Sequence, residues 1–278
     1  MTDAVRLEDG PGGLRRAIVS TPLATATIYL HGAHVTEWTP RGQRPVLFTS
    51  SGSMFETGKP IRGGVPIVFP WFGPRSDGQP GPLHGYARIS EWTIESTEQR
   101  PDGAVEVRLG LAVESVRLTY RVVVGESLEL ELTVRNKSDA EFRFEEALHT
   151  YFAVGDIRQV SITGLEGTTC VDKTDGFARK VSEGAIRFGK ETDQVHLNTT
   201  AACEIHDAAW ERVVVVEKTG SNTTVVWNPW IEKTKTLADM APDDWQQMVC
   251  VETANALENN ITLPAGAVHT LYSSIRVK

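Results

Sequence analysis

The sequence is short of basic residues and of cysteine. Its 278 residues include 28 Lys and Arg against 36 Asp and Glu, which gives a formal net charge of −8. Because nucleic-acid-binding faces are basic, nucleic acid is not expected as a partner. The three cysteines, Cys170, Cys203 and Cys250, are far apart and have no CxxC spacing. A disulfide framework or a cysteine-based zinc site is therefore not expected.

Long hydrophobic runs are also missing. The densest run is only VVVV, Val213 to Val216, whereas a membrane span needs ~20 apolar residues. The opening MTDAVRLEDG lacks the basic start and apolar run of a signal peptide. There is no GxSxG motif, no Walker loop and no GxGxxG leading from a strand into a helix. With 40% hydrophobic and 23% charged residues, the composition predicts a globular cytoplasmic protein with no membrane contact.

Alternation of apolar and polar residues with period two dominates the chain. It is clearest in AVEVRLGLAV, SVRLTYRVVV and SLELELTVRN, residues 104–113, 115–124 and 127–136. Such strands have one buried and one solvated face, as in antiparallel sheets. The short joints AVESV and VVGESL between them predict consecutive hairpins.

Other segments extend the same all-β pattern. The further strand candidates are residues 15–20, 25–30, 34–38, 91–96, 142–154, 212–218, 223–228, 248–253 and 267–277. Helical periodicity is scarce, and the best case is a short turn near PDDWQQM, which begins at Pro242. Since no linker or repeat interrupts the chain, we expect a single all-β domain over residues 1–278, a large antiparallel β-sandwich.

The stretch PLHGYARISEW places His84 and Arg88 close together, just after a segment rich in Gly, Pro and aromatic residues. Arg62 precedes that segment, and the two glycines that follow it could let a ligand approach the backbone. Two guanidinium groups around aromatic rings suit a sugar that carries an anion, with Trp71 or Phe72 against its C–H groups. A surface turn with incidental polar residues is the alternative interpretation.

Two further residues could carry acid–base chemistry. His149, in FRFEEALHTYFAV, breaks the alternation near the end of its strand; it is either a core histidine or a proton donor that titrates near ~6.5. Glu252 follows the apolar run MVCV; it is either a general base with a raised pKa or a strand-end residue that faces water. Asp193, in KETDQVH, has by itself only the pattern of a loop acid. His31 and His34 lie among strand and turn signals, so no metal site is expected.

Five segments, in order, resemble one known family. These are RGGVPIVFPWFGP, LHGYARISEW, ALHTYFAVGDI, VVWNPWIEK and DMAPDDWQQMVCVETAN, and the match runs from about Leu30 to the C-terminus. They resemble the D-hexose-6-phosphate mutarotases, or glucose-6-phosphate 1-epimerases, of the galactose mutarotase-like superfamily. The resemblance implies a large β-supersandwich, a monomer that acts on a small-molecule sugar phosphate, and no metal or cofactor.

The resemblance also implies residue roles. The catalytic pair would be His149 and Glu252, and the substrate contacts would be Arg62, His84, Arg88 and Asp193. Two positions depart from the family pattern: Tyr86 stands where Phe is usual, and Leu83 stands where some members have a glutamine that contacts the substrate. The loss of that glutamine leaves the hexose preference open.

Three other functions remain open at this point. A sugar-binding module without turnover would not need the His149 and Glu252 pair. A glycoside hydrolase would need a second carboxylate opposite Glu252, a part that Asp193 could take. A mutarotase of unphosphorylated aldoses would not need Arg62 and Arg88, because uncharged hydroxyls do not require two guanidinium groups.

Overall fold

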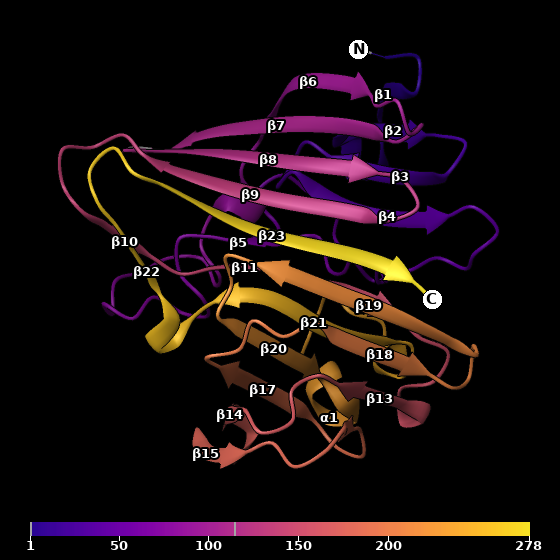
Figure 1. Ribbon diagram of the computed structural model, residues 1–278, viewed down its shortest axis with the longest axis vertical. Coiled ribbons are helices and arrows are strands. Elements are labelled where there is room, and N and C mark those ends of the chain that lie inside the picture. The colour runs from indigo at the N-terminus through magenta and orange to yellow at the C-terminus, as the bar shows by residue number, and fades with distance from the viewer. Residues whose placement is uncertain (1, 114) are drawn as a thin grey trace.

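Two large antiparallel sheets contain most of the strands of the computed structural model, which describes residues 2–113 and 115–278 (Figure 1). The nine-stranded sheet has the order β16 (Ile186–Arg187), β13 (Val160–Thr163), β18 (Cys203–Asp207), β19 (Arg212–Thr219), β23 (Val268–Val277), β9 (Leu128–Asn136), β8 (Val116–Val124), β7 (Val105–Val113) and β6 (Thr93–Gln99). The eight-stranded sheet has the order β15 (Ala178–Val181), β14 (Thr169–Asp172), β17 (Thr192–Leu197), β20 (Thr223–Asn228), β21 (Met248–Asn255), β11 (Glu146–Leu148) and β5 (Ile67–Val68), with β12 (Tyr151–Ala153) also paired to β21.

Two smaller sheets and a few short helices complete the described chain. The sheets are β1 (Val5–Asp9), β2 (Arg15–Ser20), β3 (Ala24–Tyr29) and β4 (His34–Pro40), and the pair β10 (Phe142–Phe144) and β22 (Ile261–Leu263). The helices are α1 (Trp230–Thr234) and the 3-10 turns η1 (Pro11–Gly13), η2 (Ala87–Ile89), η3 (Ile157–Gln159), η4 (Lys173–Asp175), η5 (Asp244–Gln246) and η6 (Leu257–Asn259). No helix in the described ranges has the length and apolar character to cross a membrane.

The strands that the alternation predicted are confirmed where it is most regular. Along β9, Leu128, Leu130 and Leu132 are fully buried, while the residues between them are partly exposed. β7, β8 and β9 form consecutive antiparallel hairpins, as the short joints indicated; Glu114, in the first joint, lies outside the described residues. The turn near PDDWQQM is η5. The expectation of an all-β antiparallel sandwich is therefore confirmed.

The main core lies between the large sheets. It joins Leu130 and Tyr120 of the nine-stranded sheet to Val249 and Val251 of β21. Burying one such side chain contributes roughly 1.5–3 kcal/mol. Successive residues of a strand point to opposite faces, so Cys250 and its alternate neighbours in β21 point away from this core. The core therefore fixes one face of β21 and leaves the other face for the site.

Residues 142–154 do not form the single strand that was expected. They form β10, β11 and β12, and β10 pairs with β22 in a separate two-stranded sheet. The break after β10 falls at Glu145, whose carboxylate accepts the backbone N–H groups of Phe72 and Leu257 at 2.9 and 2.8 Å. The second break falls at His149 and Thr150, between β11 and β12. Alternation does not show such breaks, because they depend on partners distant in sequence.

Candidate active site

The register of the eight-stranded sheet gathers the site on one face. Asp193 of β17 lies opposite Trp227 of β20, and Trp227 lies opposite Cys250 of β21. Tyr151 of β12 lies opposite Cys250 on the other edge. Glu252 is two residues beyond Cys250 and therefore points to the same face. Asp193 thus lies in a strand rather than in the loop that its local sequence suggested, and it shares a face with Glu252.

His149 and Glu252 form a close pair. His149 lies in the link between β11 and β12, where its backbone N–H donates to the Pro66 carbonyl at 3.0 Å. Its Nε2 is 3.2 Å from Oε1 of Glu252, and the two side chains are only 10% and 1% exposed. The ring stacks on Tyr151 at 5.0 Å between centroids and meets Trp227 edge-on at 6.1 Å. Glu252 is therefore a buried carboxyl group and not the solvated strand end that was the alternative.

Burial shifts the acid–base properties of both residues. It raises the pKa of Glu252 well above the usual carboxyl value; Asp193 adds to this rise, and Lys173 and Arg88 oppose it. It lowers the pKa of His149 well below the usual imidazole value, and the charges of Arg88 and Arg62 add to this effect. Burial therefore favours the neutral form of each residue, the carboxylic acid for Glu252 and the uncharged imidazole for His149.

His84 presents a fixed tautomer to this pair. The Gly73 backbone N–H donates to its Nδ1 at 3.1 Å, so the proton of the neutral ring is on Nε2. Burial and the Arg88 charge lower the pKa of His84 well below its usual value, so the ring is neutral. It lies edge-on to His149 at 5.6 Å and to Phe72 at 4.9 Å. The site thus has an N–H donor next to the acid–base pair.

Arg62 is already paired with protein groups. Its guanidinium has two partners: Nη2 donates to Asp239 Oδ1 at 3.0 Å, and Nη1 donates to the Tyr151 hydroxyl at 2.9 Å. The side chains of Arg62 and Asp239 are 18% and 14% exposed. Burial opposes the charge of Arg62, but Tyr151 and Asp239 raise its pKa above the usual value. Arg62 is therefore a fixed cation whose charge is largely compensated.

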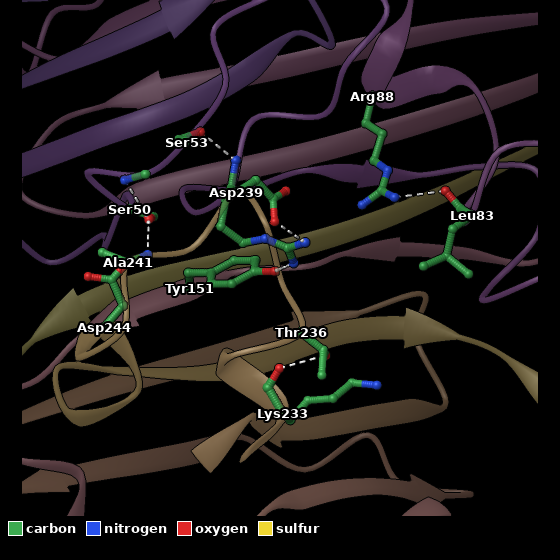
Figure 2. Close-up of polar contacts among 12 residues, drawn as sticks. Ser50, Ser53, Leu83, Arg88, Tyr151, Lys233, Thr236, Asp239, Ala241 and Asp244 are labelled. Atoms are coloured by element: carbon green, nitrogen blue, oxygen red, sulfur yellow. Dashed lines mark hydrogen bonds and ion pairs between the residues drawn. The ribbon is translucent and has the colours of Figure 1, made fainter. Parts of the chain in front are cut away.

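Arg88 differs from Arg62 in its partners. Its Nη2 donates to the backbone carbonyl of Leu83 at 2.8 Å (Figure 2). Among the described residues no carboxylate forms an ion pair with Arg88, and its buried Nε has no hydrogen-bond partner. Burial lowers the pKa of Arg88 to about 10, which leaves the group charged at neutral pH. Arg88 is thus a buried cation with capacity for an anionic ligand.

The two glycines after Arg62 do not have the role expected of them. Gly63 has φ +117 and Gly64 has φ +58, and a Cβ at these positions would lie 2.4 Å from the Phe48 carbonyl oxygen and 2.3 Å from that of Val35. The space that glycine leaves is filled by the protein's own backbone. The prediction of a close ligand approach at this point is therefore wrong.

Several site residues carried no signal of their own in the sequence. Lys173 of η4 places its Nζ 3.3 Å from Asp193 Oδ1 and 4.8 Å from the centroid of the Phe72 ring. Asp239 lies in the DMAPDD segment, but its partner Arg62 is 177 positions away. Of the two aromatic candidates, Phe72 contacts the site through His84 and Lys173. Contacts between side chains so far apart in the sequence depend on the order of the strands in the sheet, which the local sequence does not show.

No group of three or more His, Cys, Asp or Glu residues within the described ranges could hold a metal ion. His34 is fully buried, and its Nε2 lies 2.7 Å from the Gly63 carbonyl oxygen. His31 places its Nε2 2.8 Å from the Lys59 carbonyl oxygen. These two histidines therefore hold loops in place.

Comparison with known proteins places this site in a family. The family model described as aldose 1-epimerase matches residues 18–276. The chain is 37% identical over 269 residues, 94% of this chain and 89% of the relative, to an Escherichia coli K12 protein with the provisional name glucose-6-phosphate 1-epimerase. A Cenchrus ciliaris protein with the same provisional name is 34% identical over 275 residues, 92% of this chain and 82% of the relative.

A solved structure agrees with these matches. The crystal structure of a Salmonella typhimurium protein, YeaD, provisionally described as a mutarotase, superposes with a TM-score of 0.92 at 33% identity, covering 100% of this chain and 94% of that one. The chain therefore belongs to the aldose 1-epimerase family. Its function is that of an isomerase, an epimerase or mutarotase of an aldose sugar. The resemblance seen in the sequence is confirmed, and a non-catalytic module and a glycoside hydrolase are not retained.

Proposed function

We propose that this enzyme interconverts the α and β anomers of a hexose 6-phosphate, with glucose 6-phosphate as the first candidate. The observation that carries the proposal is the 3.2 Å approach of His149 to Glu252 beside Arg88, a buried cation with no carboxylate partner among the described residues. The names of the relatives from Escherichia coli and Cenchrus ciliaris support the phosphorylated substrate.

In the proposed reaction Glu252 is the base and His149 is the acid. The Glu252 carboxylate takes the proton of the C1 hydroxyl while His149 gives a proton to the ring oxygen, and the bond between C1 and the ring oxygen breaks. The aldehyde turns about the C1–C2 bond, and closure on its other face returns both protons. Each proton transfer contributes ~10²–10⁴-fold to the rate. The Nε2–H of His84 and the carboxylate of Asp193 bind sugar oxygens.

The substrate phosphate has an additional effect on the pair. The reaction needs a carboxylate on Glu252 and a proton on His149, whereas burial favours the neutral form of each residue. The charges of Arg88 and Arg62 contribute to the lowered pKa of His149. A phosphate dianion beside these guanidinium groups offsets that effect and favours the protonated form of His149. Binding of the phosphate thus also prepares the acid.

The two arginines have unequal shares in this proposal. Arg88 has N–H groups that are free to bind the phosphate, whereas Nη1 and Nη2 of Arg62 already donate to Tyr151 and Asp239. We therefore assign the main phosphate contact to Arg88 and a supporting one to Arg62.

Anomer exchange measured by NMR tests the substrate. Exchange between the α and β anomeric signals is compared for glucose 6-phosphate and for glucose at equal concentrations of enzyme. We expect the enzyme to accelerate exchange of the phosphorylated sugar far more strongly. Acceleration of glucose alone would instead establish a mutarotase of unphosphorylated aldoses.

Other expectations from the sequence remain part of the proposal. These are a monomer, a location in the cytoplasm and a single domain over residues 1–278. Sedimentation equilibrium of the purified chain measures the oligomeric state. A mass twice the 30.5 kDa of the chain would contradict a monomer.

A further inference from the structure

We propose that Lys173 is a positioning residue, which holds Asp193 toward the sugar and supplies the positive charge that lets Glu252 act as a base. This inference rests on the proposed role of Glu252. It adds a residue that neither the sequence pattern nor the comparisons assign.

The fold brings Lys173 beside Asp193 through strand pairing. β14 is the neighbour of β17, and Asp172 at its end lies opposite Gln194. The two strands are antiparallel, so the residue after Asp172, which is Lys173 at the start of η4, comes next to the residue before Gln194, which is Asp193. Asp172 also caps η4, because its Oδ1 accepts the backbone N–H of Thr174 at 3.0 Å. The backbone that carries Lys173 is thus fixed from both sides.

The ammonium group of Lys173 has two contacts. It lies 3.3 Å from Asp193 Oδ1, with the side chains 22% and 24% exposed, and 4.8 Å from the centroid of the Phe72 ring. Because both side chains are mostly shielded from solvent, salt screens this ion pair less than a surface pair. Phe72 in turn contacts His84. Lys173 therefore links two of the proposed sugar-binding residues.

Charged and titratable groups surround Glu252 on several elements. They are Lys173 of η4, Asp193 of β17, Arg88 of η2, His149 and Tyr151 around the start of β12, and Cys250 of β21 itself. Burial raises the pKa of Glu252 and so does Asp193, while Lys173 is the leading charge that lowers it. Lys173 acts in two ways: it stabilises the carboxylate of Glu252 directly, and it compensates the charge of Asp193.

The sign of the effect follows from these directions. Glu252 has to lose its proton before it can accept one from the C1 hydroxyl. Removal of Lys173 raises the pKa of Glu252 further, so less carboxylate is present at a given pH. The acidic limb of the pH–rate profile then moves to higher pH, and the rate recovers when the pH is raised.

The experiment compares Lys173→Met with Lys173→Arg, and with Lys278→Met as the matched control. Lys278 follows β23, and its Nζ pairs with Glu204 of β18 in the nine-stranded sheet rather than with a residue of η4 or β17. Anomer exchange of glucose 6-phosphate is measured by NMR against pH. We expect the acidic limb of Lys173→Met to move up by about one pH unit, which lowers kcat roughly tenfold on that limb. Lys173→Arg keeps the charge and the wild-type profile, and Lys278→Met leaves the profile unchanged.

A second measurement separates this inference from the proposed function. The side-chain carboxyl ¹³C signal of Glu252, assigned by its loss in Glu252→Gln, is titrated in ligand-free wild type and in Lys173→Met. A higher pKa of Glu252 in the variant than in wild type supports the link from Lys173 to Glu252. If that pKa rises but the pH–rate profile does not move, the inference stands and the proposed role of Glu252 as the base is wrong. A Glu252 signal that titrates as in wild type overturns the inference, whatever the activity of the variant.

Discussion

At the residue scale, the surroundings of Glu252 determine how readily its carboxylate accepts a proton. A carboxyl group in water is a weak base, but enclosure between β20 and β12 raises its affinity for a proton toward the range where it can take one and return it. His149 is shifted in the opposite direction by the same enclosure. The first shift makes the Glu252 carboxylate a stronger base, and the second makes the protonated His149 a stronger acid.

Glu252→Gln tests this pair. The amide keeps the size of the side chain but cannot take a proton, so we expect anomer exchange to fall by at least ~10²-fold. The fold and the affinity for the sugar should remain close to wild type. Exchange NMR measures the rate, and calorimetry measures binding. A variant that exchanges anomers at nearly the wild-type rate would remove Glu252 from the mechanism.

Arg88→Ala tests the phosphate contact. Hydrogen bonds to charged groups contribute roughly 1.5–3 kcal/mol, so the affinity for glucose 6-phosphate should fall about ten- to hundredfold, with little change for glucose. Arg75→Ala is the control, because Arg75 is bonded to Asp77 in the loop, with Nε donating at 2.9 Å. Calorimetric titration with both sugars decides the result. Equal losses for the two sugars would mean that Arg88 supports the loop at Leu83 instead.

At the scale of elements, a second buried cluster ties the two large sheets together. His269 of β23 lies 2.7 Å from the buried carboxylate of Glu146 in β11, and Asn255 at the end of β21 donates to that same carboxylate at 2.9 Å. Burial acts to lower the pKa of His269, but the contact with Glu146 outweighs it and raises the pKa. This stabilisation is fully present below the pKa of the unfolded histidine and is lost as pH rises through the folded pKa.

His269→Ala should therefore destabilise the fold mainly at low pH. We expect a loss of about 1–3 kcal/mol in the free energy of unfolding near pH 6, because Glu146 is left buried without its charged partner. The loss should be smaller near pH 9, where less of the wild-type histidine is protonated. Urea unfolding at the two pH values measures the difference. A loss that is equal at both would show that packing, and not charge, is what His269 contributes.

How far the sequence alone predicts an element depends on whether its partners are local. Strands β7 to β9 were predictable because their alternation and short turns are local properties. The division of residues 142–154 was not, because it depends on the carboxylate of Glu145 reaching Phe72 and Leu257.

The site follows the same rule. The roles of His149 and Glu252 came from family resemblance, while composition and periodicity left their alternatives open. Lys173 was missed because its partner Asp193 comes 20 residues later, in a strand whose pairing with β14 is not visible in the sequence.

At the scale of the whole molecule, the net charge of −8 opposes an anionic substrate at long range. Under the proposed function, recognition of the phosphate therefore depends on the local field of Arg88 and Arg62. Salt shortens the screening length from ~10 Å at 0.1 M to ~3 Å at 1 M, but it acts little on sheltered contacts.

The affinity for glucose 6-phosphate should consequently change only a fewfold over that range of salt, much less than in Arg88→Ala. Calorimetry at the two salt concentrations measures this change. A salt dependence as large as the effect of Arg88→Ala would place the phosphate on the exposed surface.

Arg88 is held by the main chain of Leu83 and not by its side chain, and that side chain is 53% exposed. Any amino acid at position 83 offers the same carbonyl group, so this position can vary during evolution without loss of the arginine's orientation. It is consequently a natural place to begin engineering the enzyme toward other hexoses, because a new side chain there keeps the carbonyl group that holds Arg88.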